Sequence, residues 1–422
     1  MTKQINKIEK LIIELCPNGV KFKTLGELGV FYGGLSGKSK DDFSNGNAKF
    51  VTYMNIFSNI AVNTDINVFV KVGKDENQNR IEYGDVLFTG SSETPDECGM
   101  SSVLTKKIDE PLYLNSFSFG FRLNDKNLLL PEFFKYLFRD EQMRKQIAKT
   151  ASGVTRFNVS KKRFAKMTIP LPPLAIQEEI VKILNSFTEL EAELEAELEA
   201  RKKQYEYYRD EMLSFGDDEV EWKELGEVWE VTKLAWYEFT KHVRYSDTGN
   251  IIALRALNVK KWTLDISQVK YVDGSEFEKL SRSKLYINDM LFTYVWTIWE
   301  VALIDINDKY YLAPNVARIR FNTEVINPTF MRYYFQTHIF ITNQINRYLS
   351  SSSMKNLTMT NIRKFRIPLP SLQKQQEIVN VLDKFDALVN DISSGLPAEI
   401  KARKQQYEYY REKLLTFKEL EK

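Results

Sequence analysis

Hydrophobic residues along this chain fall into two kinds of pattern, and each kind occurs twice. Short runs of β-branched and aromatic residues, bounded by Gly, Asn and Asp, predict strands. The runs are AKFVTYM, INVFVKVG and DVLFTG in the first half of the chain and IIALRAL, QVKYV and DMLFTYV in the second. Late in each half, a proline that follows Leu130 or Asn327 predicts the first turn of a helix. We therefore expect two α+β bodies.

A second pattern follows each IPLP motif. Two nearby prolines fix the chain in an extended form and should end any strand ladder or helix there. Beyond each motif, apolar residues recur in steps of four and three, which is the heptad spacing of a helix that packs along one seam. A helix packed on its own body would show the same spacing, but two matching copies favour packing of the seams against each other as an antiparallel pair. The first seam comprises Ile176, Ile180, Ile183, Phe187, Leu190 and Leu194, and the second comprises Ile378, Leu382, Phe385, Val389 and Ile392.

Within the first helical stretch, the tetrad ELEA is written three times over residues 189–200. Its leucines advance in steps of four and break the heptad. Alanine, leucine and glutamate are strong helix formers, so the helix should continue through the tetrads. In the second copy, Gly395 and Pro397 of SSGLPAE should interrupt it. One tetrad lengthens a helix by about 6 Å, which is on the order of one to two base pairs along a DNA duplex. The number of tetrads could therefore act as a ruler along DNA. The alternative is that the repeat reflects slippage in a solvated acidic face.

The two halves are copies of one unit of about 200 residues. Four segments recur at offsets of 198 to 202 residues, and chance does not produce that agreement. They are VKFKTLGEL and VEWKELGEV (20–28 and 220–228), IPLPPL and IPLPSL (169–174 and 367–372), EIVKILNSF and EIVNVLDKF (179–187 and 377–385), and RKKQYEYYRDEMLSF and RKQQYEYYREKLLTF (201–215 and 403–417). The bodies between them have diverged. A shared scaffold with rewritten surfaces fits two modules that read different targets.

These patterns predict the fold class. We expect an α+β protein with two globular bodies in tandem, separated by long helices that form an antiparallel coiled-coil-like spacer, with an internal twofold repeat. The segments are a short N-terminal helix (1–16), the first body (17–173), a central helical spacer (174–217), the second body (218–371) and a C-terminal helical region (372–422).

Charge is distributed unevenly over these segments. The overall net charge is only +2, but residues 17–170 hold 22 Lys and Arg against 17 Asp and Glu, and residues 220–370 hold 20 against 15. Residues 177–200 hold eight glutamates and one lysine. Two basic bodies therefore flank an acidic helix, and basic surfaces suit a polyanion such as DNA.

Two fragments are similar to catalytic motifs, but neither is complete. GGLSGKS (33–39) is similar to a phosphate-binding P-loop, yet Tyr32 occupies a position where that motif needs glycine, and no acidic Walker-B strand is visible. NPTF (327–330) is similar to the NPPF signature of amino-methyltransferases, yet Thr329 replaces the second proline and no glycine-rich cofactor loop precedes it. We therefore expect no catalytic site and no cofactor in this chain.

Cysteine and histidine are scarce. Cys16 and Cys98 cannot form a disulfide framework, and His242 and His338 are too few for a structural zinc site, so we expect no metal. The sequence has no run of about 18 apolar residues and no apolar core of a signal peptide near its start. We expect a soluble, cytoplasmic protein.

Polar and basic loops in each half suit contacts to DNA. Arginine and lysine suit guanine edges and phosphates, and asparagine suits adenine. The loops are the glycine-rich stretch, the loops after Phe88 and Thr293, and the stretch before each IPLP. Any one of their residues could instead be a surface or packing residue. The candidates are Gly33, Gly34, Ser36, Lys38, Ser39, Lys40, Ser91, Ser92, Thr94, Arg156, Asn158, Ser160 and Lys161 in the first half, and Tyr294, Trp296, Lys355, Asn356, Thr358 and Thr360 in the second.

The duplicated QYEYYR segments carry aromatic residues at heptad-like spacing, which is more typical of a helix–helix or partner interface than of base stacking. The candidates for a partner interface are Tyr205, Tyr208, Phe215, Tyr407, Tyr410 and Phe417.

Taken together, several motifs resemble the DNA-specificity (S) subunits of type I restriction–modification enzymes. They are IPLP followed by QEEIVKILNSF, the twin RKxQYEYYRxxL segments, TRFNVSKKRF before the first IPLP, and the ELEA tetrads. The resemblance covers essentially the whole chain and the order of its parts. It implies two target recognition domains, each reading half of a split, asymmetric double-stranded DNA sequence, with the helices as spacer and docking surface.

The resemblance also implies partners. Two methyltransferase (modification) subunits would dock on the helices, and restriction subunits would join them to form the nuclease; S-adenosylmethionine, ATP and Mg²⁺ would belong to these partners. In this family the number of tetrads is associated with the spacer between half-sites, which favours the ruler. The interruption at SSGLPAE departs from a symmetrical pattern. Two other classes stay open: a helical adaptor without its own sequence readout, and a self-sufficient DNA methyltransferase.

Overall fold

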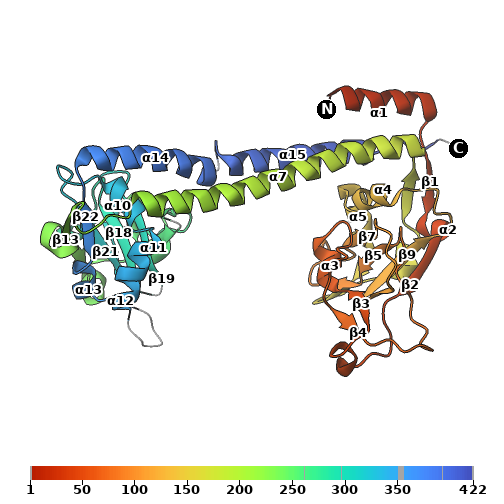
Figure 1. Cartoon of the computed structure of the whole chain (residues 1–422), viewed down its shortest axis with the longest axis horizontal. Coiled ribbons are helices and arrows are strands. Elements are labelled where there is room, and N and C mark those ends of the chain that lie inside the picture. Colours follow the sequence, from red (N-terminus) through yellow and green to blue (C-terminus); the bar gives the residue numbers. More distant parts are fainter. Residues whose placement is uncertain (1, 261, 296, 350–355, 392, 421–422) are drawn as a thin grey trace. The chain divides into compact units, whose positions relative to one another are not determined.

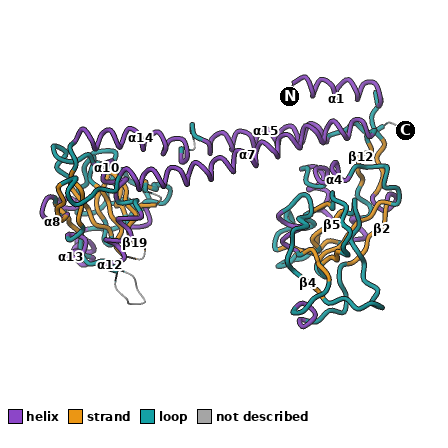
Figure 2. Tube along the Cα trace, viewed as in Figure 1, coloured by secondary structure: helices purple, strands orange, loops and turns teal. Residues whose placement is uncertain are grey.

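The computed structural model describes residues 2–260, 262–295, 297–349, 356–391 and 393–420 (Figure 1). The chain divides into two compact units. The first comprises Met1–Leu194 and Ile400–Lys422, and the second comprises Glu195–Glu399. Both boundaries fall within helices, namely α7 (Leu174–Met212) and α15 (Leu396–Leu415), so each of these helices contributes to both units. Within each unit, the strands gather in one body and long helices lie along it (Figure 2).

A four-stranded antiparallel sheet forms the centre of the first unit. All four residues of its strand β5 are buried, as expected of a short, continuous apolar run. The strand order is β2 (Gly29–Gly33), β9 (Ser118–Leu123), β5 (Val86–Thr89) and β7 (Ser101–Val103). A smaller sheet has the order β4 (Phe69–Val70), β3 (Ala48–Val51) and β8 (Leu112–Leu114), and its strands β3 and β8 are parallel.

The second unit repeats this arrangement. Its four-stranded antiparallel sheet has the order β14 (Glu230–Lys233), β21 (Val316–Arg320), β18 (Met290–Val295) and β19 (Thr297–Leu303). Strands β15 (Ile252–Leu254) and β20 (Tyr310–Leu312) form the matching parallel pair. The α+β fold class and the internal repeat are thus confirmed. One strand prediction is wrong: in QVKYV, only Tyr271 takes part in β-bridges, with Ser246 and Ile252.

Shorter elements complete both units. The first unit also contains α1 (Thr2–Leu15), β1 (Lys21–Thr24), α2 (Leu25–Leu28), the 3₁₀ helix η1 (Lys40–Phe43), α3 (Tyr53–Ser58), β6 (Ser91–Ser92), α4 (Pro131–Leu137), α5 (Glu141–Thr150), β10 (Ala151–Ser152), β11 (Phe157–Val159), α6 (Lys161–Phe164) and β12 (Thr168–Leu171). The second also contains β13 (Glu221–Glu224), α8 (Leu225–Val228), α9 (Trp236–His242), β16 (Val259–Lys260), β17 (Thr263–Leu264), α10 (Pro328–Tyr334), α11 (His338–Phe340), α12 (Asn346–Tyr348), α13 (Met359–Arg363), β22 (Arg366–Leu369) and α14 (Leu372–Asn390).

The IPLP motifs do not end the strands, contrary to the expectation from their prolines. Strand β12 runs through Pro170 and pairs with β1, and β22 runs through Pro368 and pairs with β13. Each pair is a two-stranded sheet, and an edge strand tolerates proline because one side of its backbone needs no ladder partner. In each unit this ladder joins the first strand of the body to its last.

Helix α7 is continuous through the ELEA tetrads, and the second helical arm is interrupted between Asn390 and Leu396, as the sequence predicts. The expected contact between the two apolar seams is wrong. Most residues of each seam pack on their own body, where Tyr136 of α4 donates a hydrogen bond to Asn185 at 2.7 Å and Tyr333 of α10 donates one to Asp383 at 2.6 Å. Ile392 of the second seam lies outside the described residues. The bodies offer an apolar surface that the seams must cover.

We call residues 201–215 and 403–417 the tyrosine segments. Each seam pairs with one of them. In the first unit, Phe187 lies 5.6 Å from Tyr410 between ring centroids, and Glu191 forms a 3.2 Å ion pair with Lys404. These contacts show that the helices run antiparallel. In the second unit, Tyr208 lies 5.7 Å from Phe385. Each seam therefore pairs with the tyrosine segment that belongs to the other sequence copy.

A buried glutamine anchors the start of the long helix in both units. Gln375, which has no exposed surface, accepts a hydrogen bond from the Asn327 backbone N–H at 2.7 Å and donates to the carbonyls of Val325 (3.1 Å) and Pro370 (2.7 Å). Gln177 makes the same three kinds of contact in the first unit. The loop before α10 is thereby fixed to the helix that covers the body.

Replacement of Gln375 by alanine should lower the free energy of unfolding of the second unit by about 3 kcal/mol, because one N–H and two carbonyls lose their partners in a buried site. All six tryptophans lie between positions 222 and 299, so urea denaturation followed by tryptophan fluorescence reports on this unit alone. The neighbouring Lys374→Ala, on an exposed side chain, should change the value by less than about 0.5 kcal/mol. Equal effects of the two variants would contradict the anchoring role.

Candidate nucleic-acid interface

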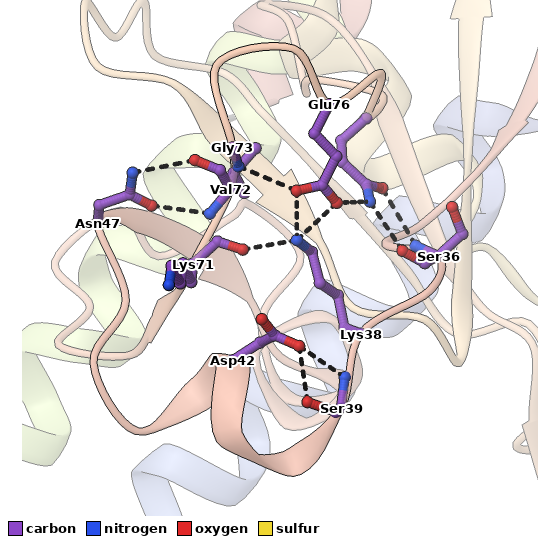
Figure 3. A network of polar contacts seen from close by, with 10 residues as sticks. Ser36, Lys38, Ser39, Asp42, Asn47, Lys71, Val72, Gly73 and Glu76 are labelled. Atoms are coloured by element: carbon purple, nitrogen blue, oxygen red, sulfur yellow. Dashed lines mark hydrogen bonds and ion pairs between the residues drawn. The ribbon is translucent and has the colours of Figure 1, made fainter.

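The glycine-rich loop of the first unit, residues 33–40, is held by a network of polar contacts (Figure 3). Lys38 donates hydrogen bonds to Glu76 at 2.5 Å and to the Lys71 carbonyl at 2.6 Å, and its side chain is only 7% exposed. The hydrogen bond from Lys38, followed by those from Gln78 and Gly73, lowers the pKa of Glu76 to about 2, so this carboxylate stays ionised at neutral pH. Lys38 thus fixes the loop and has little surface to offer a phosphate.

The other candidates in this loop have different environments. A Cβ on Gly34 would lie 1.9 Å from the Asn115 carbonyl oxygen, so close backbone approach requires glycine there. The Ser39 N–H and hydroxyl both donate to Asp42 at 2.8 Å and begin η1. Gly33 has open space where a Cβ would lie, and Ser36, Gly37, Ser39 and Lys40 are exposed. A ligand can reach the loop at these residues.

A second cluster brings together two segments that the sequence left far apart. Strand β11 pairs with β6, so that Asn158 lies opposite Ser91 and Phe157 lies opposite Ser92. The Arg156 Nε donates to the Ser91 hydroxyl at 3.1 Å. Beside them is a surface cavity of about 430 Å³, lined by Tyr53, Met54, Phe57, Ser91, Ser92, Glu93, Glu97, Thr155 and Arg156. The exposed Thr94 donates its hydroxyl to Glu97 at 3.0 Å at the same place.

The residues before each IPLP begin a short helix. The Ser160 hydroxyl accepts a hydrogen bond from the Arg163 N–H at the start of α6, and the Thr358 hydroxyl accepts one from the Asn361 N–H at the start of α13. Both side chains therefore have a structural role as N-caps. Lys161 is exposed and lies 5.6 Å from the centre of the Phe119 ring.

The second unit has the same strand-to-strand contact. Val295 forms a β-bridge with Asn356, and the Leu357 N–H donates to the Tyr294 carbonyl at 3.0 Å. Tyr294 is buried, which leaves its side chain little contact with solvent. Asn356 and Thr360 are exposed. Trp296 and Lys355 lie outside the described residues.

The tyrosine segments place their aromatic residues in two environments. Tyr205 is buried, Phe215 lies 6.3 Å from Phe330, and Phe417 packs against the core of the first unit. Tyr407 and Tyr410 are half-buried against Phe187. Of the six predicted interface residues, Tyr208 is the most exposed, at 37%. The others mainly stabilise their own unit.

The strongly exposed aromatic residues of these segments are two that the sequence reasoning missed. Tyr207 and Tyr409 occupy equivalent positions and are 63% and 62% exposed. Each ring lies edge-on against the next tyrosine, at 5.4 Å from Tyr208 and 5.2 Å from Tyr410. Helical spacing within the tyrosine segments could have identified them. Two residues along a helix correspond to a rotation of about 200°, so Tyr207 and Tyr409 lie on the face opposite to Tyr205 and Tyr407.

Comparison with known proteins decides the family. The family model described as the type I restriction modification DNA specificity domain matches residues 17–200 and again residues 217–402. The chain belongs to this family. It is 34% identical over 266 residues to the type I restriction enzyme EcoR124I/EcoR124II specificity subunit of Escherichia coli; the match covers 60% of this chain and 63% of that subunit, which is less than two thirds of its length. It is 31% identical to a Haemophilus influenzae protein described as a putative type I restriction enzyme specificity subunit, over 63% of this chain and 68% of that protein.

Solved structures share the fold. A chain from a structural study of complex assembly and conformational transition of the type I R-M system matches with a TM-score of 0.67 at 15% identity, covering 94% of this chain and 98% of that one. The HsdS subunit from Thermoanaerobacter tengcongensis matches with a TM-score of 0.52 at 16% identity, over 95% of this chain and 96% of the other. The two matches of the family model assign one specificity domain to the body of each unit.

The two specificity domains differ in the segment that follows the first strand of the central sheet. After β14, the second specificity domain carries helix α9 at the place where the first carries its glycine-rich loop after β2. Trp236 and Tyr237 of α9 are 60% and 78% exposed. In the first specificity domain, Met54 of α3 is 60% exposed beside the cavity. Sequence reasoning missed α3 because AKFVTYM was assigned to one strand, although Thr52 is a suitable N-cap and ends that strand.

The described residues contain no group of three or more His, Cys, Asp and Glu side chains that could hold a metal ion. No helix in the described ranges is long and apolar enough to cross a bilayer.

Proposed function

We propose that this chain is the specificity subunit of a type I restriction–modification complex and that it recognises a split, asymmetric DNA sequence. Each specificity domain reads one half. The observation that carries this proposal is a repeated scaffold with different side chains at equivalent positions. The strand order of the central sheet is the same in both domains, yet Ser91 stands in the first where Val295 stands in the second.

The surface charge of the domains supports a DNA ligand. Each domain carries about five more basic than acidic residues, by the counts of 22 against 17 and 20 against 15. Exposed Lys161, Lys162, Arg163 and Lys166 lie on or next to α6, a few residues after Arg156, which lines the cavity. Basic residues beside a polar cavity can hold the phosphates while the cavity reads base edges.

The tyrosine segments support two docking sites for one kind of partner. We propose that two methyltransferase subunits dock there and that restriction subunits join through them. Tyr207 and Tyr409 present the same exposed ring on the same local framework in the two units. Methyl transfer and cleavage would belong to these partners, together with S-adenosylmethionine, ATP and Mg²⁺.

The proposal is tested by expressing the chain with and without its methyltransferase subunit in a host free of other adenine methylation. Genome-wide mapping of methylated adenines should show a split sequence only when both proteins are present. Methylation by this chain alone would identify a self-sufficient methyltransferase. Two outcomes would overturn the proposal and leave this chain as an adaptor without its own sequence readout. One is methylation of an unsplit sequence, and the other is methylation of the same sequence when this chain is omitted.

A further inference from the structure

The cavity of the first specificity domain is lined by both apolar and polar side chains. Met54 and Phe57 come from α3, and the polar residues come from the segment that follows β5 and from the hairpin that carries Arg156. Three separate segments of the chain therefore converge on one concavity. Such a lining is typical of a binding site, where apolar residues contact the ligand and a few polar groups fix its orientation.

Arg156 is held in a defined orientation within this cavity. Its Nε donates to the Ser91 hydroxyl, and the Ser91 carbonyl in turn accepts a hydrogen bond from the Tyr53 hydroxyl at 2.9 Å. The hairpin backbone is fixed as well, because Gly153 has a φ of +152° and a Cβ there would lie 2.0 Å from the Arg156 carbonyl oxygen. The guanidinium is thus positioned before any ligand arrives.

The outer edge of the guanidinium is available. Among the contacts of the described residues, the only hydrogen bond from the Arg156 side chain is the one from Nε, and the residue is exposed. The two terminal nitrogens form a fork that fits two acceptors side by side, as offered by O6 and N7 of guanine in the major groove or by two phosphate oxygens.

Charge around the fork favours a base over a phosphate. Glu93 and Glu97 line the same cavity, and Glu97 accepts hydrogen bonds from the hydroxyls of Ser92 (3.2 Å) and Thr94 (3.0 Å). Two carboxylates repel a phosphate. They do not repel an uncharged base edge, and a carboxylate can accept from the exocyclic amine of a cytosine.

We propose that Arg156, oriented by Ser91, reads one guanine in the half-site recognised by the first specificity domain. At the described residues of the second specificity domain, the equivalent of Ser91 is Val295, which has no hydroxyl to orient an arginine. The inference rests on the proposed function, since it names the base that one domain reads.

The test uses the full chain expressed with its methyltransferase subunit, with methylated adenines mapped across the genome. Arg156→Ala should relax one guanine position of one half-site, so that sites with another base there gain about tenfold to a hundredfold in relative methylation. The other positions and the second half-site should keep their preference. Arg156→Lys should relax the same position, because lysine keeps the charge but loses the fork. Lys145→Ala, which removes an exposed charge elsewhere in the first unit, should change nothing.

Ser91 is tested as a positioning residue with two variants of equal shape. Ser91→Val should relax the same guanine position, and Ser91→Thr, which keeps the hydroxyl, should not. If Arg156→Lys leaves the preference intact while Arg156→Ala weakens methylation uniformly at all positions, the residue binds a phosphate and the inference is overturned. An unchanged profile for Arg156→Ala also overturns it. A wild-type profile without a split site refutes the proposed function instead.

Discussion

Deletion of one ELEA tetrad, residues 193–196, should shorten the gap in the methylated sequence and leave both half-sites unchanged. Helix α7 is continuous through the tetrads, so the deletion removes about 6 Å of helix, which corresponds to about two base pairs. A four-residue step also returns the helix to within about 40° of its original face. Methylation of the original sequence should fall by roughly a thousandfold, since one half-site would be out of register and each mismatch costs about 1–3 kcal/mol.

The controls separate length from helix rotation. Insertion of one extra tetrad should lengthen the gap by the same amount. Deletion of Ala196 alone rotates the rest of the helix by about 100°. This variant should therefore abolish methylation, and should not produce a gap that is shorter by a fraction of a base pair. The readout is the mapped methylated sequence of each variant. A change in the bases of either half-site after tetrad deletion would contradict the ruler.

The double variant Tyr207→Ala with Tyr409→Ala should lose both methyltransferase subunits. Each ring is exposed, yet it is braced by a neighbouring tyrosine that itself packs on a phenylalanine of its unit. A rigid, exposed tyrosine is typical of the residues that dominate interfaces, where truncation costs about 2 kcal/mol or more. Native mass spectrometry of the assembled complex should show two methyltransferase subunits for the wild type, one for either single variant, and none for the double variant.

A matched control is available in the first specificity domain. Phe117 is 68% exposed on a loop, so Phe117→Ala removes a similar aromatic surface away from the tyrosine segments. This variant should bind two methyltransferase subunits. Retention of two subunits by the double variant would show that the partner docks elsewhere.

Much of the fold could be predicted from the sequence because the chain contains two copies of it. Agreement between the copies identified the bodies. The continuous helix α7 was predicted from the helix formers of the tetrads, and the interruption before Leu396 from Gly395 and Pro397. The partners of the seams could not be predicted in this way. Heptad spacing shows that Ile180 and Ile378 are buried, but a body, the opposite seam or a tyrosine segment would bury them equally well. The strand through Pro170 was missed because local chemistry excludes proline from most ladders but not from an edge.

The candidate site was predictable at the level of loops but not of side chains. The chemistry of Lys38 gave no indication that Glu76, distant in the sequence, would hold it. Likewise, nothing in the residue types alone joined Ser91 to Arg156, because their contact depends on the pairing of β6 with β11. Ser160 belongs to a stretch predicted to contact DNA, but its hydroxyl serves as a helix cap.

The exchange of tyrosine segments has a consequence for how such a chain can be assembled. The first unit is completed by Tyr407 and Tyr410, and the second by Tyr208, so each core includes aromatic residues from the other copy. A chain with one copy would have to obtain its missing segment from a second molecule, and its stability would then depend on protein concentration. Covalent linkage makes that exchange intramolecular, at an effective concentration that can reach the millimolar range. Duplication within one chain thus makes the stability of both cores independent of protein concentration and allows the two specificity domains to diverge separately.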